Sequence, residues 1–434
     1  MTAHDIKRIS WPFLVALGIF ATFSILILIP KFPPLLYDFP DWVYQSVLLR
    51  DWLQGHPHPD YLLKPYPVPF SAMIYFIGGL SLVIPWTLAA KLLWIATGGF
   101  AIFAVSYFLR ASGQRDLRVW LIVPTFVLIN QTWWWGASGF LMGLPLEFLG
   151  AGFFLRGKVD AVHWIPLTLA AFFIHGLHLI VLGMLTCVEA IRTRSIRPFL
   201  YLVPAGLLSV AYLYGRYVVL HNAETMHYDP GFAFFSLLFL FFKINGLAKS
   251  MGFANPLGVG GPVLVHWFGP YGLAALEVLV SISVLAAWSL LIPRAWQAWT
   301  GKIGNERERL LWGLLAVLVF IFLICPTTFL DVSDFGQRML EIALALGLCL
   351  AFRFNWAGKI LCFVSLAFVC LNLTLIGVLA DNPAPTGAAA PMLGPMARFS
   401  AMNHTQRYNY YQAIETGRMN LIVFPTALFL KKQP

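Results

Sequence analysis

Charged residues are scarce in this sequence. Only 11% of the 434 residues are charged, whereas 59% are hydrophobic, and the mean hydropathy is +0.76. Residues 11–30 contain no charge except at the boundary that follows them, and a helix of that length is about long enough to cross a hydrocarbon core of roughly 30 Å. The composition therefore indicates a membrane protein.

Motifs of cysteine and of metal-binding residues are also missing. No CxxC or HExxH pattern occurs, and the five cysteines stand singly in apolar runs: Cys187, Cys325, Cys349, Cys362 and Cys370. They predict neither disulfides nor a metal cluster. The first apolar run also lacks a small-residue cleavage pattern at its end, while Lys7 and Arg8 precede it. We interpret this run as an uncleaved membrane anchor.

Apolar runs recur along most of the chain. We expect further membrane segments at 68–84, 86–109, 119–133, 137–155, 162–191 (as one long helix or two short ones), 198–220, 270–292, 310–329, 338–352 and 359–380. Lipid cannot satisfy exposed backbone polar groups, and these runs are too long and too apolar for strands. Residues 1–380 are therefore predicted to form one all-α polytopic bundle of about 10–12 helices. A Pro- and Ala-rich stretch follows, so 381–434 are expected to be an extracytoplasmic linker and a short tail packed on the bundle.

The formal charge of +10 lies mostly in short connectors between apolar runs. This distribution predicts topology rather than nucleic-acid binding, because cytoplasmic loops collect Lys and Arg. It places the loops 31–67, 221–268 and 330–337 and the tail on the outer side. The basic connector 110–118 conflicts with two crossings between 68 and 109. Either one of those two segments crosses only partly, or 162–191 is a single crossing and the charge rule fails there.

The first outer loop carries two acids in an apolar setting. Asp38 and Asp41 stand within Tyr37-Asp-Phe-Pro-Asp-Trp42, ahead of an amphipathic stretch at 41–53. Such a stretch predicts a helix lying along the membrane surface. Asp is a favoured N-cap residue, so helix capping is the alternative to chemistry for either acid, and it is favoured for Asp41.

The longest outer loop, 221–268, holds Glu224, His227 and Asp229 before a very apolar stretch at 232–242. A long loop in a compact domain is more often functional than idle. We expect either a piece that handles lipid or simple packing on the bundle. These three side chains could complete a divalent cation site (Mg²⁺ or Mn²⁺) with Asp38 and Asp41, because hard cations ask for more oxygen ligands than two carboxylates supply.

Four short motifs, taken in order, resemble the GT-C superfamily of polytopic glycosyltransferases. They are Asp38-Phe-Pro-Asp41-Trp42, then Trp135-Gly-Ala-Ser-Gly-Phe140, then His175-Gly-Leu-His178, and finally Asp334-Phe-Gly-Gln-Arg338. The resemblance implies a catalytic aspartate near the outer end of the first helix, which Asp38 matches best and Asp41 next. It also implies a polyprenyl-phosphate-linked sugar as donor and an inverting reaction.

On this hypothesis one carboxylate takes the acceptor's proton while the phosphate leaves. The bulky neighbours of Asp38 can desolvate it and raise its pKa toward a useful value. Arg338, at the outer mouth of a late membrane helix, is the candidate for holding the phosphate through paired hydrogen bonds. An ion pair with Asp334 at (i, i+4) is its structural alternative.

The remaining candidates are expected to line the substrate site or to support it. His175 and His178 stand three apart, a spacing that suits a metal site, but a hydrogen-bonded core or hinge role is favoured and no metal site is predicted. Trp42 and Trp135 could stack on a sugar, although the run Trp133–Trp135 is most simply an interfacial belt. Glu147 and Glu341 are expected to be paired inside the bundle.

The sequence thus predicts a multi-pass membrane glycosyltransferase in the bacterial inner membrane, with its site on the extracytoplasmic face. The expected partners are a polyprenyl-phosphate-linked sugar, a glycan, lipid or protein acceptor, and membrane lipids. A transporter or flippase is one rival, but the internal repeat typical of that class is not evident. A membrane acyltransferase with His175 as base is the other.

Overall fold

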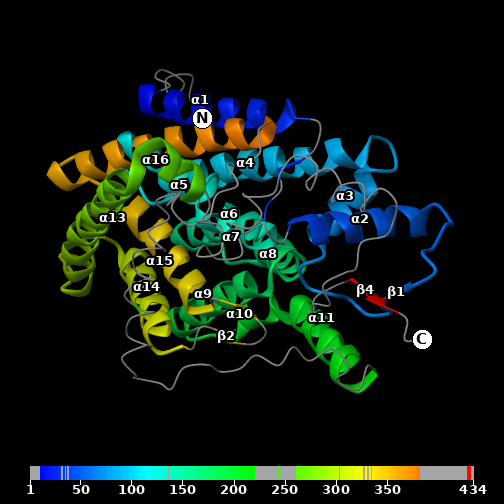
Figure 1. Cartoon of the computed structure of the whole chain (residues 1–434). Helices are drawn as coiled ribbons and strands as arrows, with labels where there is room; N and C mark the ends of the chain where they lie inside the picture. Colours follow the sequence, from blue (N-terminus) through cyan, green and yellow to red (C-terminus); the bar gives the residue numbers. More distant parts are fainter. Residues whose placement is uncertain are drawn as a thin grey trace, which may run out of the picture.

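Long apolar helices make up most of the chain in the computed structural model. The structure describes residues 10–30, 33, 34, 36, 39–134, 136–219, 243, 261–302, 304–325, 328, 329, 332, 333, 335–381 and 428–431. Within these ranges the predicted all-α polytopic bundle is confirmed (Figure 1). Six of the expected site residues lie outside the described residues: Asp38, Trp135, Glu224, His227, Asp229 and Asp334.

The elements follow one another with short connections. The α-helices are α1 (Trp11–Leu28), α2 (Phe39–Leu53), α3 (Ala72–Leu80), α4 (Trp86–Ala111), α5 (Val123–Val127), α6 (Gln131–Trp134), α7 (Ser138–Leu155), α8 (Ala161–Ile174), α9 (Gly176–Thr193), α10 (Arg197–Leu200), α11 (Val203–Tyr214), α13 (Gly261–Trp299), α14 (Glu306–Ile324), α15 (Phe335–Ala351) and α16 (Trp356–Asp381). A 3₁₀ turn η1 (Leu117–Leu121), a π turn η2 (Gly215–Val219) and the strands β1 (Tyr61–Leu63), β2 (Thr328–Phe329), β3 (Val332–Ser333) and β4 (Phe429–Lys431) complete the described structure.

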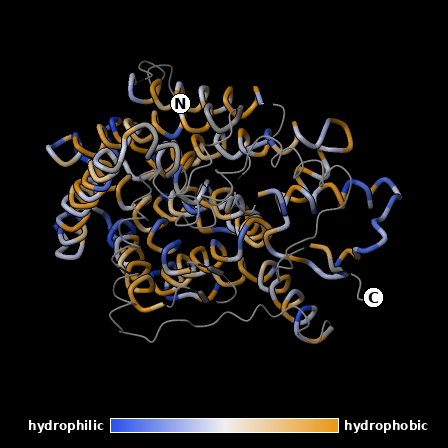
Figure 2. The backbone as a smooth tube through the Cα atoms, in the orientation of Figure 1, coloured by the Kyte–Doolittle hydropathy of each residue, from blue (hydrophilic) through white to orange (hydrophobic). Residues whose placement is uncertain are grey.

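Six of these helices are long and apolar enough to cross a membrane by length and composition, namely α1, α4, α7, α9, α13 and α16. The 14-residue α8 is a shorter apolar helix. Helix α15 has 17 residues, and α14 opens with four charged residues, Glu306 to Arg309. Figure 2 shows hydrophobic residues along the helices and hydrophilic ones in connections such as the loop after α2. The protein is a multi-pass membrane protein.

The uncertainty over the connector 110–118 is resolved by the short helix α3. Only nine residues of the segment 68–84 form a helix, which is too short to span. Lys91, at the start of α4, donates to the backbone carbonyls of Leu28, at 3.2 Å, and of Pro30. The start of α4 therefore lies beside the end of α1, and one of the two predicted crossings is only partial. The connector then lies at the same end of the bundle as the start of α1.

We name the two ends of the bundle from this arrangement. The basic end carries the connectors after α4 and after α15, where the Arg118 guanidinium lies 4.0 Å from the centre of the Phe354 ring. The α2 end carries α2, α3 and the pair β1–β4, which lie together at one side of the molecule, near the C-terminus (Figure 1).

The predicted segment 119–133 is broken into η1, α5 and α6 instead of one helix. Pro124 lies in the first turn of α5, and the side chain of Asn130 accepts a hydrogen bond from Trp133 N at 2.8 Å, so that a new helix starts at α6. Trp133 and Trp134 are 0% and 5% exposed. For these two residues the predicted interfacial belt is wrong, because the broken segment turns them into the core.

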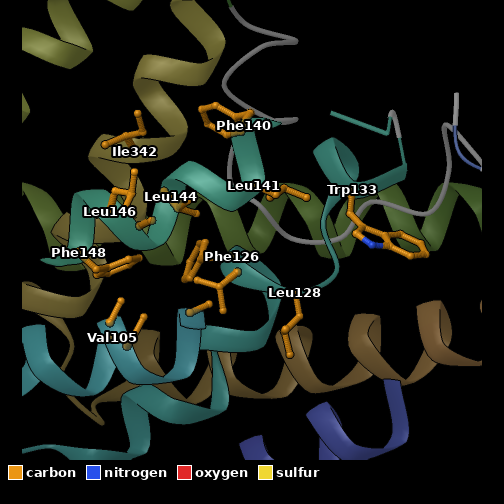
Figure 3. Close-up of a cluster of buried hydrophobic side chains, with 14 of the residues drawn as sticks. Val105, Phe126, Leu128, Trp133, Phe140, Leu141, Leu144, Leu146, Phe148 and Ile342 are labelled. Atoms are coloured by element: carbon orange, nitrogen blue, oxygen red, sulfur yellow. The ribbon is translucent and has the colours of Figure 1, made fainter. Parts of the chain in front are cut away.

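The core centres on α7, which is buried along nearly its whole length. Figure 3 shows Leu144 and Phe148 of α7 among side chains of α4, α5 and α15, represented by Val105, Phe126 and Ile342. Packing on three sides explains why α7 has so little lipid-facing surface, and it holds the first turn of α7 rigidly at the α2 end.

The segment 162–191 forms two helices, α8 and α9, which run antiparallel. Trp164, early in α8, donates from Nε1 to Thr186 Oγ1, late in α9, at 2.8 Å. Between the helices the backbone of His175 is extended, with φ −168° and ψ 119°. The tip of this helical hairpin therefore lies at the α2 end, where Gly139 of α7 approaches the carbonyl of Ile174.

Helix α2 exists as predicted, but it is enclosed rather than spread on a membrane surface. All residues from Phe39 to Leu49 are buried, including the polar Gln45 and Ser46. The C-terminal segment covers it, since β4 pairs with β1 and Leu428 N donates to Gln45 Oε1 at 2.7 Å. The amphipathic pattern predicted a free helix because nothing local in the sequence announces that residues 428–431 fold back onto it.

Asp116 joins η1 to the start of α16 at the basic end. Its carboxylate accepts hydrogen bonds from Arg118 Nε at 2.7 Å, from Arg118 Nη2 at 3.1 Å and from Phe354 N at 2.9 Å. Burial works to raise the pKa of Asp116, but the hydrogen bonds from Arg118 and Phe354 outweigh it, and the pKa is lowered. Such a group stabilises the fold above its unfolded pKa of about 3.9, and the contribution is lost as the pH falls through the folded pKa.

We therefore expect Asp116→Ala to lower the thermal midpoint in detergent by a few degrees at pH 7, since hydrogen bonds to charged groups contribute about 1–3 kcal/mol. The difference from wild type should shrink as the pH is lowered below about 4. Melting curves across that pH range test this. Asp51→Ala is the matched control, because Asp51 pairs with its neighbour Arg50 on the same helix. Equal losses in the two variants would contradict the role given to Asp116.

Candidate functional site

Arg338 and His175 meet at the α2 end of the bundle. Arg338 lies in the first turn of α15, and its Nη1 is 3.1 Å from His175 Nε2 at the tip of the α8–α9 hairpin. The guanidinium also lies over the Phe140 ring of α7, 5.3 Å from the ring centre. A cation is thus held between an imidazole and an aromatic face, a combination that is favourable for arginine.

The contact with Arg338 defines the protonation of His175. Arginine has only donors, so His175 Nε2 must accept and the ring must be neutral, with its proton on Nδ1. The Nδ1 atom is also 3.3 Å from Leu177 N, where it would have to accept to cap α9. A neutral ring cannot satisfy both contacts. The contact with Arg338 is the shorter one and is assisted by charge, so it decides the tautomer.

Phe70 presses on the same imidazole from the first outer loop. Its ring centre is 4.1 Å from that of His175, in an edge-on arrangement. The backbone of Phe70 has φ +67°, in the left-handed region that a bulky residue rarely adopts. Strain of this kind persists only where surrounding structure imposes it, and it clusters at binding and catalytic sites.

A fully buried pair, His178 and Glu147, supports the site from below. His178 Nε2 donates to the backbone carbonyl of Phe140 at 2.9 Å, and its Nδ1 is 3.0 Å from Glu147 Oε1. Both side chains are 0% exposed. Because Phe140 O can only accept, one proton lies between Nδ1 and Oε1, and the pair is neutral as a whole. The pair joins α7 to α9 and fixes Phe140, which carries Arg338.

Glycine at position 143 makes room for this pair. A Cβ atom at Gly143 would overlap the His178 ring. The ring of Phe140 stacks on His178, with centres 5.1 Å apart and an interplanar angle of 27°. The approach of α9 to α7 therefore depends on a missing side chain, which is why the imidazole reaches Glu147.

Two further polar contacts lie deeper in the bundle. Glu341, one turn after Arg338, accepts a hydrogen bond from Thr132 Oγ1 at 3.0 Å. Trp134 Nε1 donates to Asn372 Oδ1 at 2.6 Å. The prediction that Glu147 and Glu341 are paired inside the bundle is confirmed, as is the hydrogen-bonded role expected of His178.

Asp41 and Trp42 lie in the first turn of α2 and are 1% and 8% exposed. Asp41 is the third residue of the helix, so it is not the N-cap residue that the sequence suggested. A carboxylate in the first turn still stabilises the positive end of a helix. The same end holds Phe39, whose ring packs on Trp94 of α4 with centres 5.1 Å apart. The start of α2 is therefore anchored next to the start of α4.

The structure brings together Arg338, His175 and His178 from motifs that are far apart in the sequence. It also adds residues that the sequence did not single out for the site, namely Phe70, Phe140 and Glu147. Among the described residues no group of three or more His, Cys, Asp or Glu side chains could hold a metal ion. The acids and histidine of the loop 221–268 and Asp38 itself lie outside the described residues, so a divalent cation stays a prediction.

Comparison with known proteins gives little help. No protein-family model and no curated protein matches the sequence. Among solved structures, the fold is similar to the Archaeoglobus fulgidus oligosaccharyltransferase in its apo form, with 10% sequence identity and a TM-score of 0.36. The match covers 98% of this chain and 61% of that enzyme's chain. A TM-score this low carries no argument about function.

Proposed function

We propose that the chain is a membrane glycosyltransferase that takes a sugar from a polyprenyl-phosphate donor at the α2 end of the bundle. Arg338 holds the donor phosphate, Asp38 is the base that removes the proton of the acceptor hydroxyl, and the displacement inverts the sugar carbon. We place the α2 end on the extracytoplasmic side of a bacterial inner membrane, because basic connectors collect on the cytoplasmic side.

The setting of Arg338 is the observation that carries this proposal. A guanidinium at the mouth of a membrane helix is costly unless it has a partner or a function. Here it rests against Phe140 and His175 and lies away from the basic end. Its planar donors match a phosphate group. The pair His178–Glu147 and the strained Phe70 hold the surroundings of this cation in place.

The base is proposed from sequence and from the anchoring of its neighbours. Asp38 directly precedes Phe39, the first residue of α2. Phe39 packs on Trp94, and Lys91 binds the carbonyls at the end of α1. A reacting group gains from such fixed flanks, because catalysis needs a base held within hydrogen-bond reach of the proton. Asp41, enclosed in the first turn of α2, is the nearest alternative.

The acyltransferase alternative is disfavoured by the contact between His175 and Arg338. A histidine base needs a free ring nitrogen to take a proton. Nε2 of His175 accepts from Arg338 Nη1 at 3.1 Å, and Nδ1 carries the proton. An arginine next to the ring also opposes its protonation by charge repulsion. The transporter alternative has no comparable supporting contact among the described residues.

The test is donor binding by variants of Arg338. We expect Arg338→Lys to weaken binding of a polyprenyl-phosphate sugar about tenfold, and Arg338→Gln more, because the paired charged hydrogen bonds are lost. Binding can be measured by the quenching of tryptophan fluorescence in purified, detergent-solubilised protein. Unlike turnover, binding does not require the acceptor to be known.

Arg156→Lys is the matched control. Arg156 also places a guanidinium over an aromatic ring, that of Tyr107, at 4.7 Å, but at the basic end of α7. It should leave donor affinity unchanged. If the Arg338 variants keep their thermal midpoint and bind the donor as tightly as wild type, Arg338 is a structural residue and the proposed site is wrong.

A further inference from the structure

A pocket at the basic end is separate from the proposed active site. Its volume is about 440 Å³, and its lining includes Gln114, Arg115, Arg294 and Arg353. These residues come from the connector after α4, from α13 and from the connector after α15. A pocket of this size falls in the range of small-molecule sites, roughly 300–1,000 Å³.

The two acids that line the pocket are already neutralised. Asp116 is bound by Arg118, whose Nε is 2.7 Å from Oδ1. Glu308 forms an ion pair with Arg294 at 3.2 Å. The acids therefore do not cancel the charges of Arg115 and Arg353, and the pocket keeps a positive potential.

Arginine donors around the pocket lack acceptors within the described part of the chain. Arg115 forms no ion pair there, and the buried Nε of Arg294 has no hydrogen-bond partner. Arg353 is bound only by neutral oxygens, with Nη1 3.4 Å from Gln114 Oε1 and 3.0 Å from Phe352 O. A buried donor without an acceptor costs about 1–3 kcal/mol, so a ligand that supplies acceptor oxygens would be favoured.

The position of the pocket narrows the class of ligand. It lies where α4 and α15 end and α14 begins, at Ala111, Ala351 and Glu306. The ends of membrane-crossing helices lie at the level of lipid headgroups. Basic pockets between such helices suit anionic headgroups, and each Lys or Arg near the surface adds about 1 kcal/mol of attraction.

We propose that this pocket binds a phosphate group, as carried by an anionic phospholipid headgroup or by a free phosphate compound. Arg115 and Arg353 supply the charge, and the enclosed Nε of Arg294 supplies a fixed donor. The site lies at the opposite end of the bundle from Arg338, and it does not depend on the function proposed there.

The experiment measures binding of dioctanoyl phosphatidic acid to the purified full-length protein, with dioctanoyl phosphatidylcholine as the comparison lipid. Wild type should prefer the phosphatidic acid by at least about tenfold, since its exposed phosphate can take several charged hydrogen bonds. The double variant Arg115→Gln/Arg353→Gln should lose that preference. Arg115→Gln alone should reduce affinity severalfold, and because Arg115 has no ion-pair partner among the described residues it should not disturb folding.

Two control variants show whether binding belongs to the pocket. Arg197→Gln removes an exposed arginine at the basic end that is not part of the pocket lining, and it should change affinity less than twofold. Arg338→Gln should also leave the affinity unchanged, which distinguishes the pocket from the proposed donor site. Equal losses in Arg115→Gln and Arg197→Gln, or equal binding of the two lipids by wild type, would overturn the proposal.

Inorganic phosphate then identifies the source of the ligand. Competition at millimolar concentration would show that the pocket recognises the phosphate group itself, as a free phosphate compound would present it. Failure to compete, with the preference for phosphatidic acid retained, would show that the headgroup must arrive with its lipid.

Discussion

Replacing Asp38 with Asn is expected to lower the rate of sugar transfer about 10²–10⁴-fold, the usual contribution of a general base. The amide keeps the shape of the side chain but cannot take the proton of the acceptor hydroxyl. Donor affinity should change little, because the donor phosphate is assigned to Arg338. The measurement is transfer from a polyprenyl-phosphate sugar in proteoliposomes, together with the binding assay described for Arg338.

Asp41→Asn is the matched control for Asp38→Asn. Asp41 lies in the first turn of α2, three residues further along, and is 1% exposed. It should lower stability, because a buried carboxylate is replaced, but it should leave the rate per folded molecule within about tenfold of wild type. If instead Asp41→Asn abolishes transfer and Asp38→Asn retains it, Asp41 is the base.

Glu147→Ala is expected to destabilise the folded protein by roughly 2–5 kcal/mol, the cost of removing one partner from a buried pair. His178 Nδ1 would lose its partner at 3.0 Å in a fully buried setting, next to Phe140. Phe140 and the hairpin tip would then be less well held under Arg338. Thermal unfolding in detergent and donor affinity should both fall.

The conservative variant Glu147→Gln tests whether the pair itself matters. Its amide can still form a hydrogen bond with His178 Nδ1, so the loss should be well below that of Glu147→Ala, about 1–2 kcal/mol. A double variant that also replaces His178 with Leu should be less destabilised than the sum of the single changes, because it leaves no buried polar group alone. Equal effects of Ala and Gln at position 147 would contradict the pairing.

Hydropathy was enough to predict the bundle and several of its elements. The runs around α1, α4, α7 and α16 are long and apolar, and lipid allows such runs only one structure, the helix. The charge pattern also identified the weak point, because the basic connector 110–118 required a partial crossing. Which segment was partial depended on Lys91 bonding to the end of α1, a contact between residues 61 and 63 positions apart.

Other features depended on contacts that no local pattern encodes. The contact of Arg338 with His175 joins residues 163 apart, and that of Gln45 with Leu428 joins residues 383 apart. Hydropathy cannot distinguish a helix covered by a distant strand from one facing lipid, so α2 was predicted on the surface. For the same reason Trp133 was predicted at the membrane interface, although it is 0% exposed in the core.

The central claim is that this chain consumes a lipid-phosphate sugar. Its most direct test is the release of polyprenyl phosphate from a labelled polyprenyl-phosphate sugar in proteoliposomes that also contain total membrane lipid and glycan as acceptors. We predict release with wild type and with Arg156→Lys, and at least about 10²-fold less with Asp38→Asn. Absence of release by folded wild-type protein that binds the donor, or equal release by Asp38→Asn, would contradict that claim.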